Sequence, residues 1–121
     1  PDFLRVRNQA GRWEEARGMT YSVFLDDERY PPLGSGMIIA RDLHGFIELV
    51  QQRGELPSFI SFDHDLGENE PTGYDVAKWI VSADLDGSHR IPDDFGFYVH
   101  SMNPIGAENI RYLLRNYLEN R

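Results

Sequence analysis

The stretch FISFDHDLG, residues 59–67, decides the fold that we expect for this chain. Phe59–Phe62 is an apolar run with the length of a buried strand, and it stops abruptly at Asp63. Asp63, His64 and Asp65 are three consecutive side chains that titrate or bind metal ions. The pattern indicates a buried strand with reactive groups at its carboxyl end.

The same change from apolar to reactive residues occurs at two other places. Residues 23–25 lead into Asp26 and Asp27, and residues 95–99 lead into His100. In an open parallel sheet the carboxyl ends of the strands lie along one edge, and ligands bind in the crevice at that edge. We therefore expect the three clusters to converge on one site.

Strands and amphipathic helices alternate along most of the chain. Four strands are predicted, at residues 21–26, 37–40, 59–62 and 95–99. One helix is capped by Asp42 and stopped by Gly54, because its apolar residues follow helical spacing between them. A second helix opens at Thr72, and a third begins with Pro104 in its first turn, while residues 84–94 are predicted to be a polar loop. This alternation predicts an α/β fold with a mostly parallel sheet.

Two segments do not follow the alternation. Residues 28–36, ERYPPLGSG, contain too much Pro and Gly for a helix, so a loop is predicted in place of the first crossover helix. Residues 1–20 hold two short apolar groups around NQAG, residues 8–11, and are predicted to be an N-terminal extension that forms a hairpin along the sheet edge. Residues 21–121 then form the one domain expected for a chain of 121 residues.

Composition narrows the classes of function. Acidic residues outnumber basic ones by 20 to 12, so the formal net charge is −8, which argues against an extended groove for nucleic acid. There is no Cys, so thiolate metal sites are excluded and a cytoplasmic location is expected. No apolar stretch approaches the roughly 20 residues that a membrane span requires, so no membrane association is expected.

The residues at the strand ends are compatible with two kinds of chemistry. His64 and His100 ordinarily titrate near neutral pH, so they could serve as the base and the acid of a hydrolysis. Alternatively, four carboxylates could hold a hard divalent cation such as Mg²⁺ or Mn²⁺: Asp26, Asp27, Asp63 and Asp65. We favour the metal-assisted site, because the crowded carboxylates would otherwise repel one another and any phosphate.

Three further residues are candidates to bind a phosphate. Arg29 offers a planar pair of donors, and Ser101 and Asn103 lie at the start of the last helix. Each also has an ordinary structural explanation. Arg29 could be a surface residue, Ser101 could bond to backbone, and Asn103 before Pro104 is first of all a natural helix N-cap.

The order of these residues resembles that of the receiver domains of response regulators. In receivers, two acids such as Asp26 and Asp27 hold Mg²⁺ together with a phosphoacceptor Asp, whose place is taken by Asp63. Ser101 also stands in receiver order. The Lys that receivers place before a Pro is Asn103 here, so the resemblance does not extend to phosphoryl signalling through that Lys.

Four motifs in sequence are similar to the receiver-derived family of cyclic-phosphate processing receiver domains: LDDER at 25–29, DHDLG at 63–67, TGY at 72–74 and VHSMNP at 99–104. This resemblance implies a compact, receiver-like (flavodoxin-like) three-layer α/β sandwich. It also implies a phosphodiesterase or phosphatase-like hydrolase, with a 2',3'-cyclic RNA end or a small cyclic nucleotide as its substrate. The alternative is a degenerate receiver that binds phosphate or metal as a signalling module without catalysis.

Overall fold

The computed structural model describes residues 5–7, 13–15 and 21–121. Strands β1 (Arg5–Arg7) and β2 (Trp13–Glu15) pair antiparallel and form a two-stranded sheet. The turn that was predicted at residues 8–11 lies outside the described residues. The place of this hairpin along the edge of the larger sheet, and the division of the chain at residue 20, stay predictions.

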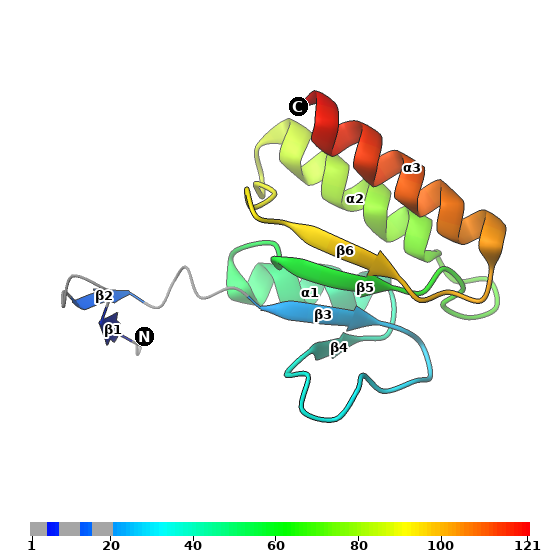
Figure 1. Ribbon diagram of the computed structural model, residues 1–121, viewed down its shortest axis with the longest axis horizontal. Helices are drawn as coiled ribbons and strands as arrows, with labels where there is room; N and C mark the ends of the chain where they lie inside the picture. Colours follow the sequence, from blue (N-terminus) through cyan, green and yellow to red (C-terminus); the bar gives the residue numbers. More distant parts are fainter. Residues whose placement is uncertain (1–4, 8–12, 16–20) are drawn as a thin grey trace.

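Four parallel strands form the main sheet, in the order β4-β3-β5-β6 (Figure 1). They are β3 (Ser22–Leu25), β4 (Ile38–Ala40), β5 (Phe59–Phe62) and β6 (Gly96–Val99). Each strand lies within one residue of its predicted bounds. The register places Leu25 opposite both Ala40 and Phe62, and it places Phe62 opposite Val99. The strands therefore end together at one edge of the sheet.

Three helices follow β4, β5 and β6 in the described part of the chain: α1 (Leu43–Arg53), α2 (Gly73–Asp86) and α3 (Pro104–Asn120). The predicted caps are present. The Asp42 side chain accepts a hydrogen bond from the Gly45 N–H at 2.7 Å, and Thr72 forms a capping box with Asp75.

Helix α2 is longer than predicted. The sequence indicated a loop from Asp84 onward, but the helix continues to Asp86. It ends at Gly87, whose φ of 79° is left-handed and therefore suits a residue without a side chain. The predicted loop is wrong at its first three residues, because the glycine rather than the polar composition ends the helix.

The hydrophobic core lies on one face of the sheet. Side chains alternate along each strand, so Val23, Leu25, Ile60 and Phe62 share a face. The inner residues of all three helices pack against this face: Phe46, Val50, Val76, Ala77, Ile80, Ala107, Ile110 and Leu114. In Figure 1, α1 lies behind the sheet, whereas α2 and α3 lie along the side of β6.

The opposite face of the sheet carries none of these three helices. Phe24, Ser61 and Tyr98 lie on it, and Tyr98 is 61% exposed. The described residues thus confirm the parallel α/β fold and form two of the three predicted layers. A loop, as predicted, replaces the first crossover helix between β3 and β4. None of the helices described combines the length and the apolar character that a bilayer crossing would need.

Candidate functional site

Asp26 lies at the carboxyl end of β3 and is only 1% exposed. Its Oδ1 accepts hydrogen bonds from the backbone N–H groups of Glu28 at 2.9 Å and Arg29 at 2.8 Å, so the chain turns around this carboxylate. Its Oδ2 accepts from Nε2 of His100 at 3.0 Å. Burial alone would raise the pKa of Asp26, but these hydrogen bonds together hold it below its usual value. Asp26 is therefore a buried carboxylate.

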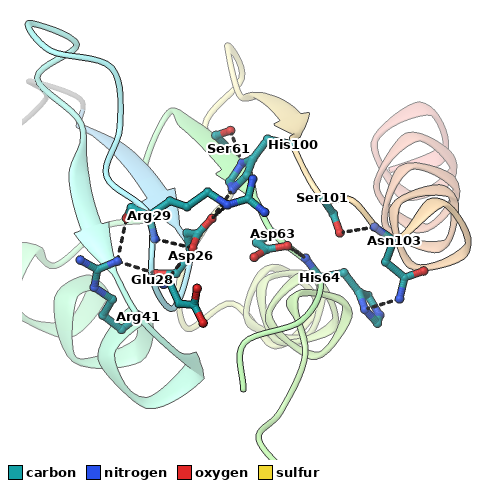
Figure 2. Close-up of polar contacts among 10 residues, drawn as sticks. All are labelled: Asp26, Glu28, Arg29, Arg41, Ser61, Asp63, His64, His100, Ser101 and Asn103. Carbon is teal, nitrogen blue, oxygen red and sulfur yellow. Dashed lines mark hydrogen bonds and ion pairs between the residues drawn. The ribbon is translucent and has the colours of Figure 1, made fainter. Parts of the chain in front are cut away.

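Both ring nitrogens of His100 are engaged (Figure 2). Because an ionised Asp26 can only accept, Nε2 of His100 must carry the hydrogen of that bond. Nδ1 of His100 lies 2.7 Å from Oγ of Ser61, so in the neutral ring it accepts from the Ser61 hydroxyl. The ring also stacks on Phe24, with 4.5 Å between the centroids and 4° between the planes. His100 is thus fixed on the helix-free face of the sheet.

Asp63 follows β5 and is 7% exposed. Its Oδ1 accepts from the backbone N–H of His64 at 2.8 Å. Burial, and next the negative charge of Asp26, raise the pKa of Asp63 above its usual value. The pKa values of the two carboxylates are therefore shifted in opposite directions, and Asp63 has the higher proton affinity.

Asp26, Asp63 and His100 form a compact group of potential metal ligands. Each offers one ligand atom, and these atoms lie within 4.8 Å of one another. The convergence expected of the three strand ends is present. Carboxylate oxygens suit Mg²⁺ and Mn²⁺, and a cation would offset the repulsion between Asp26 and Asp63, so this set of ligand atoms fits a hard divalent cation. Because Nε2 of His100 carries a hydrogen directed at Asp26, the two carboxylates are stronger metal ligands than His100.

His64 belongs to a second cluster, on the side of α3. Its Nδ1 lies 2.9 Å from Oδ1 of Asp65, and the Asn103 amide donates to Oδ2 of Asp65 at 3.4 Å. The imidazole is largely buried against Gly106, where an added Cβ would collide with the ring. Figure 2 shows His64 directed toward Asn103 and away from the Asp26 carboxylate. The two predicted histidines therefore do not lie together.

Asn103 has the structural role that the sequence suggested for it. Its Oδ1 accepts from the Gly106 N–H at 3.0 Å and caps α3. Its own N–H donates to Oγ of Ser101 at 3.0 Å. The start of α3 is therefore already satisfied by the protein, and Asn103 joins the His64 cluster through its amide nitrogen.

A cleft of about 450 Å³ opens at this edge of the sheet. It is lined by the two buried acids, the predicted Arg29 and Ser101, and the loops on either side: Asp26, Asp27, Glu28, Arg29, Asp63, Asp65, Gly67, Glu68, Ser101 and Met102. The predicted metal ligands thus fall into two groups, since Asp27 and Asp65 line the cleft without joining the compact group of Asp26, Asp63 and His100.

Arginines hold the loop after β3 beside the cleft. Nε of Arg29 lies 3.7 Å from Oδ2 of Asp26, and the Arg29 side chain is 52% exposed. Arg41 donates through Nη1 to the carbonyl oxygens of Asp26 at 3.1 Å and of Arg29 at 2.7 Å. Its guanidinium also lies over the ring of Tyr30, 4.9 Å from the centroid. Arg41 therefore fixes the loop, and the half-exposed Arg29 lines the cleft beside Asp26.

Several residues of the site were not assigned roles from the sequence, among them Phe24, Arg41 and Ser61, and Glu28, Gly67, Glu68 and Met102 of the cleft lining. Ser61 could have been found from the sequence, because it is the only polar residue of the run 59–62. Alternation along the strand places it on the other face of the sheet from Ile60 and Phe62. Nothing local marks Arg41, since its partners are backbone carbonyls 12 and 15 residues earlier.

The loop after β5 is closed at its base. The Gly73 N–H donates to the His64 carbonyl oxygen at 2.7 Å. A Cβ at position 73 would collide with the Asp63 carbonyl oxygen, so only glycine permits this approach. Residues 65–72 thus form a surface loop with paired ends, and three of them line the cleft: Asp65, Gly67 and Glu68.

Comparison with protein families gives the class to which this fold and site belong. Residues 21–116 match the family described as the cyclic-phosphate processing receiver domain. The chain belongs to that family, as its four motifs suggested, and the family's description implies a role in cyclic-phosphate processing. Neither the curated proteins nor the solved structures gave a match.

Proposed function

We propose that this protein is a phosphodiesterase that opens a cyclic phosphate by hydrolysis, assisted by a divalent cation. The observation that supports this most directly is the group of Asp26, Asp63 and His100, which stands at the cleft of a domain whose family is described by cyclic-phosphate processing. A cyclic phosphodiester needs an activated water, a proton for the leaving oxygen and positive charge around the phosphoryl group.

The charge of the cleft argues for the cation. Six of the ten lining residues are acids and one, Arg29, is a cation, so without a bound cation the cleft would repel a phosphate. Asp26 and Asp63 would hold the ion, with Asp27 and Asp65 at the rim. When bound, a divalent cation supplies charge stabilisation of the phosphoryl oxygens and lowers the pKa of a water molecule.

Within the protein, we assign the base to Asp63. One of its oxygens is fixed by the His64 N–H, and its carboxylate lies in the compact group at the floor of the cleft, where the attacking water would be bound. Water forms the new bond to phosphorus while its proton passes to Asp63. The ring P–O bond breaks, its electron pair stays on the leaving oxygen, and that oxygen takes a proton. Arg29 and Ser101 bind the phosphate in this proposal.

His64 and His100 remain the candidates for the acid that protonates the leaving oxygen, as the sequence suggested. His100 also has a structural role, since its Nε2 donates to Oδ2 of Asp26 while two backbone N–H groups bind Oδ1. We assign His100 primarily to the positioning of Asp26. His64 would need its free Nε2 to reach the substrate from the side of α3.

Hydrolysis of 2',3'-cyclic and 3',5'-cyclic mononucleotides by the purified protein tests the proposal. We expect turnover with Mn²⁺ or Mg²⁺ and its loss in EDTA. Asp63→Asn should lower kcat by about 10²-fold or more, which is the usual contribution of a positioned base. Asp94→Asn, an exposed acid remote from the cleft, is the matched control. Full activity of Asp63→Asn would exclude the assigned base, and undiminished turnover in both His64→Ala and His100→Ala would exclude roles for the histidines.

One observation favours the signalling alternative. Asp63 stands at the phosphoacceptor position of receivers with Asp26 beside it, whereas Asn103, which replaces the receiver Lys, caps α3. Incubation with acetyl phosphate separates the two functions. A stable mass gain of one phosphoryl group on Asp63, without hydrolysis of any cyclic phosphate, would favour a receiver-like module.

A further inference from the structure

The acids of the cleft lie at two depths. Asp26 and Asp63 are buried at its floor, while Asp27, Glu28, Asp65 and Glu68 form the rim. Arg29 is the one basic residue among the described lining, and part of its charge already faces Oδ2 of Asp26 at 3.7 Å. The floor acids can be neutralised by a cation. Of the rim acids, Asp65 contacts His64 and Asn103, whereas the described contacts give Asp27, Glu28 and Glu68 no basic partner among the lining residues.

The rim therefore acts on whatever extends from the bound phosphate. A volume of 450 Å³ corresponds to a cube with edges of about 8 Å, which is close to the screening length at physiological salt. A second phosphate attached to the ligand would lie within that length of several rim carboxylates. Each such contact is repulsive and only partly screened, so every added phosphate weakens binding.

The cleft also offers one apolar side chain. Met102 lines it, is 82% exposed and follows Ser101 directly. A thioether packs well on the edge or face of an aromatic ring, so Met102 suits the base of a nucleotide. The cleft is thus suited to a ligand that has one phosphate with an uncharged, flat group beside it.

Resting on the proposed function, we infer that the cleft selects a cyclic phosphate that bears a single phosphate group, such as a free nucleoside cyclic monophosphate, and discriminates against the same cyclic end on an RNA strand. The floor binds the one phosphate, Met102 receives the base, and the rim excludes the next phosphate of a polynucleotide. Glu68 is the clearest discriminating residue, because its exposed side chain has no described hydrogen-bond partner and lies on the loop 65–72.

The test compares three ligands with the same 2',3'-cyclic end: a mononucleotide, a dinucleotide and a hexanucleotide. Both kcat/KM and the dissociation constant, from calorimetry with Mn²⁺, are measured at low and high NaCl. At low salt we expect kcat/KM to be at least about tenfold lower, and the dissociation constant at least about tenfold higher, for the hexanucleotide than for the mononucleotide. This gap between the two ligands should narrow as salt screens the rim. Glu68→Lys should reduce the gap several-fold, whereas Glu119→Lys, an exposed residue at the end of α3 that is remote from the cleft, should leave it unchanged.

The outcomes separate the two proposals. Equal or better hydrolysis of the hexanucleotide would overturn the inference and leave the proposed function standing. If no ligand were hydrolysed, the proposed function would fail, and the order of the dissociation constants would still decide the inference. A gap that neither salt nor Glu68→Lys changes would also overturn it, since the discrimination would then not be electrostatic.

Discussion

Nε2 of His100 donates to Oδ2 of Asp26 across 3.0 Å, although the two residues follow strands that are not neighbours in the sheet. Strand β5 lies between β3 and β6, so the backbones are about two strand spacings, or about 10 Å, apart. The imidazole spans this distance over Ser61, a residue of the intervening strand, and bonds to it as well. The three strands that build the site are thus connected by one side chain.

Replacing Asp26 should destabilise the protein in a pH-dependent manner. Asp26→Asn loses a charged acceptor and leaves the Nε2–H of His100 facing an amide, so we expect a loss of about 2 kcal/mol at neutral pH. The pKa of Asp26 is lower in the folded protein than in the unfolded chain. Its stabilising effect is therefore complete above about pH 4 and disappears as the pH falls through the folded value. Urea unfolding between pH 2 and pH 7 measures both effects, and an equal loss at all pH values would contradict the assignment.

Replacing Asp63 should stabilise the metal-free protein, whereas replacing Asp26 should destabilise it. Its pKa is raised in the folded protein, so ionised Asp63 costs stability, and this cost develops as the pH rises through the ordinary value of Asp toward the folded value. In EDTA at pH 7, Asp63→Asn should be more stable than the parent by about 1 kcal/mol, a common size for a single substitution. The same variant should lose the increase in Tm that Mn²⁺ gives the parent protein. A destabilised Asp63→Asn in EDTA would argue against the repulsion between the two acids.

Removing the hydroxyl of Ser61 should weaken the protein by about 1 kcal/mol, because Ser61→Ala leaves Nδ1 of His100 without its partner in a buried site. Ser82→Ala, an exposed position of α2, is the control and should change the free energy of unfolding by less than about 0.5 kcal/mol. Nitrogen NMR of the His100 ring adds a second reading. The hydrogen should stay on Nε2 in Ser61→Ala, since Asp26 still requires a donor there.

Adding a methyl group at position 106 should displace His64. Gly106→Ala places a Cβ against the imidazole, and we expect a loss of about 1–3 kcal/mol, as for other overpacked sites. In a His64→Ala background the same change should be neutral or favourable, because alanine is the better helix former. A double-mutant cycle on the free energy of unfolding measures this coupling. Equal effects of Gly106→Ala in both backgrounds would show that the clash is relieved elsewhere.

Much of the fold and part of the site could be predicted from local patterns. The alternation of strands and helices predicted a parallel sheet, and a parallel sheet brings the residues after each strand to one edge. That reasoning is sufficient for Asp26, Asp63 and His100, because their backbones are fixed by the strand register.

The direction of a side chain could not be predicted in the same way. His64 directly follows Asp63, yet its ring is held by Gly106 and Asn103 on a helix about 40 residues later in the chain. The stack of His100 on Phe24 likewise joins residues of two strands that do not pair. Such contacts depend on tertiary packing, and neither residue type nor spacing along the chain encodes them.

The hydrogen bond that closes the base of the loop 65–72 separates the selection of the ligand from the positioning of the reactive acids. The Gly73 N–H and the His64 carbonyl oxygen join the ends of the loop, Leu66 is buried in the core, and Thr72 caps α2. The exposed residues 68–70 can therefore be exchanged without loosening Asp63 on the strand below. Substitutions at these exposed positions change which ligand is accepted while the reactive acids keep their geometry. Residues 68–70 are therefore the positions at which a sequence library would change selectivity in this domain with least effect on its stability.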